Sequence, residues 1–159
     1  MTRFVTILFA CLVAAGCDIG PRSDYGKLGL ISAHGLITLD GEPIEGAVVT
    51  FNDLTNGTFS YGLTDSSGHY RLQLDSEHDG VTPGEKTVEV STTRKILGLN
   101  SEEDAGESSV EKPQKKSEKT KDMIPECYNK LSGLKINVSS SQTAYDFDLK
   151  SDCSTKASK

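Results

Sequence analysis

Cys17 has the position in this chain that most directly suggests a reaction. It follows an apolar run that begins at Phe4 and ends in the small residues Ala14, Ala15 and Gly16. A thiol is nucleophilic enough to take up a lipid group, and small residues before it would let an extended backbone enter a protease site. The sequence AAGC resembles the lipobox of bacterial signal sequences, in which the cysteine is acylated and the chain is cut just before it.

The apolar run is too short to cross a bilayer as a helix. A membrane-spanning helix needs about 20 apolar residues, whereas residues 4–15 have the length of the apolar region of a secretory signal. We therefore expect residues 1–16 to be a lipoprotein signal peptide and Cys17 to be the lipid-anchored N-terminus of the mature chain, since more than one acyl chain gives a stable anchor. The alternatives are a cleaved signal without lipid and a retained anchor.

We expect Cys127 and Cys153 to be joined by a disulfide. Cys11 lies within the expected signal and Cys17 takes the lipid, so these two are left as an even pair in an exported, oxidising setting. Folding the runs between them into a hairpin around residues 140–143 would bring them opposite each other. Two free thiols are the alternative. A metal site is disfavoured because no CxxC motif and no nearby histidine supplies further ligands.

One acidic stretch could bind calcium. Asp75, Glu77 and Asp79 stand at alternate positions before Gly80, as in a calcium-binding loop. The position at which such a loop needs a bidentate glutamate holds Lys86, so an ordinary acidic loop is the favoured interpretation. We therefore predict no metal and no cofactor, and keep these three carboxylates as candidates only.

The remaining residue types do not indicate catalysis or nucleic-acid binding. The three histidines, His34, His69 and His78, have no partner spacing that defines a general base. Motifs of zinc hydrolases, nucleophile elbows and phosphate-binding loops are missing from the sequence. The net charge of -6 and the lack of a basic cluster interleaved with aromatic residues argue against a nucleic-acid footprint. We expect no enzyme and no nucleic-acid partner.

Alternating apolar and polar residues predict the strands that must position these side chains. The predicted strands occupy residues 35–41, 47–51, 70–74, 87–91, 134–139 and 145–150. Their inward positions are Ile37, Leu39, Ala47, Val49, Phe51, Tyr70, Leu72, Leu74, Val88, Val90, Leu134, Ile136, Val138, Tyr145, Phe147 and Leu149. Turn residues separate the runs, as at Asp40-Gly41, 65–68 and Pro83-Gly84. Short strands without a helical period predict an all-β fold, a single β-sandwich of about seven strands.

The composition along the chain predicts the domain organisation. Residues 17–28 are polar and lack a period, which is typical of a flexible tether. The β-sandwich is expected over residues 29–152. Within it, residues from about 98 to 123 are charged and small, cannot bury apolar surface, and are expected to form a disordered insertion. Residues 153–159 are left as a C-terminal tail.

Four stretches of the sequence carry a resemblance to a known family. They are GLITLDGEPIEGAVVTF, TDSSGHYRL, GVTPGEKTVEVS and IPECYNKLSGLKINVSSSQTAYDFDLKS. Their order, and the joint occurrence of Pro-x-x-Tyr-Asn with the final Phe-Asp-Leu, resemble the small lipoproteins of planctomycete-type bacteria with carboxypeptidase regulatory-like, or transthyretin-like, domains. The resemblance implies a Greek-key sandwich of the prealbumin type, also Ig-like, on a lipid anchor, and it implies no activity. Cys127 and Cys153 are not part of the family pattern.

Together these features predict where the protein resides and what kind of module it is. We expect an exported, membrane-anchored lipoprotein of the periplasm or cell surface, with a non-catalytic β-sandwich as a structural or protein-interaction module. Its expected partners are the membrane, through Cys17, and an envelope protein. The alternative is a binding module for carbohydrate or another small ligand, for which Phe59, Tyr61 and Tyr128 are the candidate exposed aromatic residues.

Overall fold

A computed structural model describes residues 28–96, 99–100 and 121–156 of the chain. The expected signal peptide, Cys17 and the tether up to residue 27 lie outside the described residues, as does most of the charged insertion. In the described part, no helix is both long and apolar enough to span a membrane.

Eight strands and a short 3-10 helix lie in the described residues. The strands are β1 (His34–Leu39), β2 (Glu42–Pro43), β3 (Val48–Asn52), β4 (Phe59–Leu63), β5 (His69–Arg71), β6 (Gly84–Ser91), β7 (Leu134–Val138) and β8 (Phe147–Leu149), and the helix is η2 (Glu126–Tyr128). The prediction of an all-β fold is confirmed.

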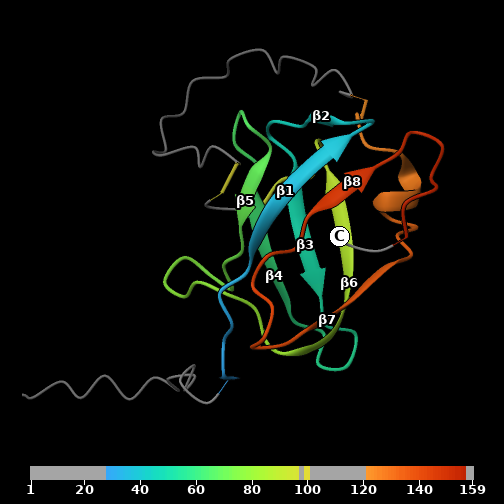
Figure 1. The fold of residues 1–159 in the computed structure, drawn as a ribbon. Helices are drawn as coiled ribbons and strands as arrows, with labels where there is room; N and C mark the ends of the chain where they lie inside the picture. Colours follow the sequence, from blue (N-terminus) through green and yellow to red (C-terminus); the bar gives the residue numbers. More distant parts are fainter. Residues whose placement is uncertain (1–27, 97–98, 101–120, 157–159) are drawn as a thin grey trace, which may run out of the picture.

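The strands form two mostly antiparallel sheets. In the first sheet, β1 pairs with β2 and β5 in antiparallel and with β8 in parallel orientation. The second sheet has the order β4-β3-β6-β7, with every pair antiparallel. Figure 1 shows the two layers, with β1 and β8 in front of β3 and β6. An isolated bridge between Tyr61 and Gln73 links the two sheets along one side. The arrangement is consistent with a β-sandwich.

The core lies between the two sheets and is built from the inward positions of the strands. Phe51 of β3 is at its centre, with ring centroids 5.7 Å from Tyr145 and 6.2 Å from Phe147, both in edge-to-face geometry. The positions predicted to face inward are buried, with two exceptions: Leu39 and Leu74 are half-buried. Period-two alternation therefore identified the buried face of each run.

The last two strands do not form the predicted hairpin. β7 pairs with β6, with Leu134 opposite Val88, whereas β8 pairs with β1, with Phe147 opposite Ile37. The chain between β7 and β8 thus crosses from one sheet to the other. Alternation shows which face of a strand is buried and does not show which strand lies beside it, and for this reason the sequence allowed both arrangements.

The predicted pairing of Cys127 with Cys153 is confirmed by a route other than the hairpin. Cys127 lies in η2 and Cys153 in the turn after β8, and the Cα atoms of the bridged pair are 6.1 Å apart. The neighbouring Tyr128 hydroxyl accepts hydrogen bonds from the backbone N–H groups of Lys150 and Thr155. η2 therefore packs against the segment that follows β8. A disulfide across a sequence separation of 26 is expected to stabilise the fold by about 3.5 kcal/mol.

Asp122 fixes the point at which the charged insertion returns to the domain. Its carboxylate accepts hydrogen bonds from the Thr92 backbone N–H at 2.9 Å, the Asn129 side-chain amide at 2.8 Å and the Ser91 hydroxyl. Burial raises the pKa of Asp122, but the hydrogen bonds from Ser91, Thr92 and the Ile124 backbone outweigh it and lower this pKa below its ordinary value. The end of the expected insertion at 121–123 thus belongs to the structured domain.

Candidate functional site

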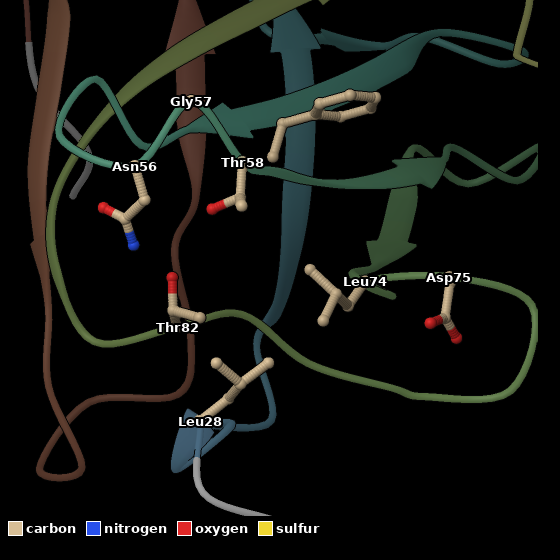
Figure 2. Close-up of a pocket in the computed structure, with 8 residues that line it drawn as sticks. Leu28, Asn56, Gly57, Thr58, Leu74, Asp75 and Thr82 are labelled. Atoms are coloured by element: carbon tan, nitrogen blue, oxygen red, sulfur yellow. The ribbon is translucent and has the colours of Figure 1, made fainter. Parts of the chain in front are cut away.

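A groove of about 330 Å³ opens at the end of the domain where the described chain begins. Figure 2 shows the side chains that line it. They come from the first described residue, from the β3–β4 loop, from the start of β4 and from the connection between β5 and β6. The lining residues are Leu28, Asn56, Gly57, Thr58, Phe59, Leu74, Asp75 and Thr82. This volume is at the lower end of the range typical of small-molecule sites.

The loop between β3 and β4 supplies one side of the groove. Its ends are held together because the Asp53 backbone N–H donates to the Thr58 carbonyl at 2.8 Å and the Gly57 N–H donates to the Asp53 carbonyl at 2.9 Å. Gly57 has a φ of 68°, in the left-handed region that favours glycine. The closed loop presents Asn56 and Thr58 to the groove and starts β4 at Phe59.

The apolar part of the groove is exposed. Leu28 retains 41% of its accessible surface and Phe59 retains 47%. The Phe59 ring lies 6.0 Å from the Tyr61 ring at an interplanar angle of 45°. Exposed apolar side chains that lie together beside a groove are typical of a contact site, so this end of the domain is the best candidate surface for a ligand or a partner.

The polar part of the groove can supply hydrogen bonds. In Figure 2 the Thr82 hydroxyl points toward Asn56 across the groove. Asp75 lies at one end of the groove. Its carboxylate accepts hydrogen bonds from the backbone N–H of Glu77 and from the His78 ring, and these bonds lower its pKa below the ordinary value. The groove therefore combines an amide, hydroxyl groups and a carboxylate with the apolar side chains.

The three candidate calcium ligands do not form a site. One oxygen of Asp75 already accepts the backbone N–H groups of Glu77 and His78, at 2.9 and 2.8 Å. Among the described residues, which include Glu77 and Asp79, no group of three or more histidine, cysteine, aspartate or glutamate side chains could hold a metal ion. The Asp75 carboxylate serves instead to shape the turn after β5.

Only part of the predicted aromatic platform is accessible. Phe59 is exposed and Tyr61 is half-buried, whereas Tyr128 retains only 1% of its surface. The expectation that Tyr128 is exposed was wrong, because its ring is part of the core and its hydroxyl binds the C-terminal segment. Phe59 is therefore the main aromatic contact available to a ligand in the groove.

A second recess, of about 420 Å³, lies beside β5 and has a different chemistry. Its lining includes His34 of β1, His69 and Arg71 of β5, and Asp65 of the preceding turn. This grouping is not evident from the sequence, because it depends on the pairing of β1 with β5. The only sequence signal was that Tyr70 faces inward, which places its two neighbours on the outer face.

Comparison of the chain with protein families, with curated protein sequences and with solved structures finds no match.

Proposed function

We propose that the protein is a lipid-anchored, non-catalytic β-sandwich of the cell envelope that acts as a structural or protein-interaction module. The observation that carries the proposal is the position of the groove, because Leu28, the first described residue, lines it. The 11 residue steps from Cys17 to Leu28 span at most about 40 Å when extended. A lipid on Cys17 would thus keep the groove near the bilayer surface, where an envelope protein is the expected partner.

The disulfide supports export of the chain. Disulfides such as that between Cys127 and Cys153 persist in oxidising compartments and are rare in the cytosol. An exported location agrees with the signal-like N-terminus, which delivers a lipidated chain to the periplasm or the cell surface.

We also propose a Greek-key sandwich of the transthyretin or prealbumin type. Two features support it: the two sheets face a common core, and β8 returns from the far end of the chain to lie beside β1. β2 has only two residues, and seven strands are left when it is not counted. This topology would fit the resemblance to carboxypeptidase regulatory-like lipoproteins.

Mass spectrometry of the protein from its native membrane fraction tests the anchor. We expect the mass of residues 17–159 plus acyl groups, rising by two hydrogen atoms on reduction of the disulfide. The Cys17→Ser variant should lose both the acyl mass and the membrane association, whereas the Cys11→Ser variant should keep both. A membrane-extracted chain without acyl mass would disprove the anchor.

A second candidate function is saccharide binding in the groove. It is favoured because the exposed Phe59 lines the same groove as Asn56 and Thr58, and sugars pack a face on an aromatic ring and bond through their hydroxyl groups. On a glycan array, we expect saturable binding that the Phe59→Ala variant weakens by at least about tenfold. Leu131→Ala is the control, because Leu131 is exposed and does not line the groove. Equal binding by Phe59→Ala and the unmodified chain would exclude this function.

A further inference from the structure

We propose that the recess beside β5 is a binding site for a small oxyanion, the phosphate or carboxylate group of a small molecule. The groups that would hold it are Arg71, His34 and His69. This inference does not depend on the lipid anchor or on the groove at Leu28.

Strand pairing brings the three nitrogen-bearing side chains to one place. His34 of β1 lies directly opposite Arg71 of β5, and Leu36 lies opposite His69. Side chains directly opposite in an antiparallel pair have Cβ atoms about 4.5–5.5 Å apart, and diagonal neighbours are still within reach of long side chains. The guanidinium and both imidazoles can therefore contact a single small group between them.

The backbone around His34 is fixed on both sides, so the recess is built before a ligand enters. The His34 N–H donates to the Thr143 carbonyl at 3.0 Å, and the His34 carbonyl accepts from the Tyr145 N–H at 2.8 Å. On the other edge, the neighbouring Gly35 is paired with Tyr70. A site carried by paired strands loses little conformational entropy on binding.

The Arg71 guanidinium and the two imidazoles of the recess, those of His34 and His69, take part in no side-chain ion pair or hydrogen bond with the described residues. Two carboxylates lie nearby and are directed at backbone donors instead. Asp65 accepts the N–H groups of Ser67 and His69, at 2.8 and 3.0 Å.

The second carboxylate, that of Asp146, also accepts a backbone N–H group and lies on the other side of β1. It precedes β8 and accepts the Leu36 N–H at 2.9 Å. An exposed guanidinium beside two imidazoles is thus available to an external anion, although the chain as a whole has a net charge of -6.

The size and geometry of the recess set the class of ligand. A volume of about 420 Å³ admits a small molecule and is within the usual range for such sites. The planar fork of arginine matches phosphate and carboxylate groups through two parallel hydrogen bonds. Imidazole N–H groups can donate to the remaining oxygens.

Titration of the full chain carrying Cys17→Ser with inorganic phosphate tests this proposal. The Cys17→Ser substitution removes the expected lipid, so that the anchor cannot cause the vesicle binding measured below. We expect saturable NMR shifts confined to the amides around His34, His69 and Arg71. Arg71→Gln should weaken binding at least about tenfold, as should His34→Gln to a lesser degree. Lys130→Gln, which removes an exposed cation outside the recess, should leave it unchanged.

Shifts spread over the surface, equal binding by Arg71→Gln, or no saturable shift would each overturn the proposal. Repeating the titration with acetate shows whether carboxylate is also accepted. Co-sedimentation with phosphatidylglycerol vesicles shows whether the phosphate can belong to a lipid headgroup. Binding to vesicles that is lost in Arg71→Gln would assign the site to a lipid. Binding to free phosphate alone would assign it to a soluble ligand.

Discussion

Replacing Asp53 with alanine is expected to lower the free energy of unfolding by about 3–5 kcal/mol, because it leaves a buried ammonium group without its counter-charge. Lys86 of β6 points into the sandwich and retains only 1% of its accessible surface. Its Nζ atom lies 2.7 Å from Oδ2 of Asp53 and 3.0 Å from the carbonyl oxygen of Pro83. Urea denaturation at neutral pH measures the loss.

The double variant Asp53→Ala with Lys86→Met is the matched control. Methionine has a similar length and no charge, and replacing both members of a buried ion pair by apolar residues is often nearly neutral. We therefore expect the double variant to recover most of the stability that Asp53→Ala loses. The part not recovered reports the hydrogen bond that the Thr55 N–H donates to Asp53 at 2.9 Å. A loss below about 1 kcal/mol in Asp53→Ala would mean that Lys86 reaches water, against its observed burial.

The same pair also makes stability depend on pH. The hydrogen bond from Lys86 lowers the pKa of Asp53; burial opposes this, and the backbone N–H groups of Thr55 and Asn56 add to the lowering. Between the lowered folded pKa and the ordinary unfolded value, the unfolded chain binds more protons, so stability rises with pH. The contribution is therefore complete above the unfolded value and is lost as pH falls through the folded pKa. The double variant should lose less stability than the unmodified chain on acidification below about pH 4.

Lys86 also shows what the alternation of residue types can and cannot predict. It stands two positions before Val88, on the inward face of the same strand, but a lysine contributes nothing to an apolar pattern. Its burial depends on Asp53, which lies 33 positions away in the sequence. Sequence patterns predict which apolar residues are buried, whereas a buried charge becomes evident only once its distant partner is placed.

Features set by a local turn are predictable from the sequence, whereas features set by the pairing of distant strands are not. Local turn signals were sufficient for some features: Asp40-Gly41 does join β1 to β2, with positive φ at both residues. The meeting of His34 with Arg71 depends on the register between two strands, and alternation is equally compatible with several registers and neighbours. The separation of β7 from β8 was missed for this reason, and so was the grouping of histidines beside β5.

At Gly35 of β1 the backbone of the segment before β8 comes so close that no side chain fits. A Cβ atom built there would lie 1.9 Å from the Tyr145 carbonyl oxygen and 2.6 Å from its carbonyl carbon. Because these are backbone atoms of the segment leading into β8, no side-chain rotation can relieve the overlap. That carbonyl oxygen also accepts the Tyr70 hydroxyl at 2.7 Å. A side chain at position 35 would therefore separate β1 from the β8 segment and break a buried hydrogen bond.

We expect Gly35→Ala to destabilise the fold by about 4 kcal/mol or to prevent folding, since it combines overpacking with the loss of buried hydrogen bonds. The control is Gly133→Ala, because a Cβ atom there meets nothing within 4 Å; this change should alter stability by less than about 1 kcal/mol. Thermal unfolding of both variants gives the comparison. Stability of Gly35→Ala equal to that of Gly133→Ala would show that β8 does not lie against β1 at this point. The pairing of His34 with Arg71 depends on β1 and β5, so this outcome would leave the register of the oxyanion recess untouched.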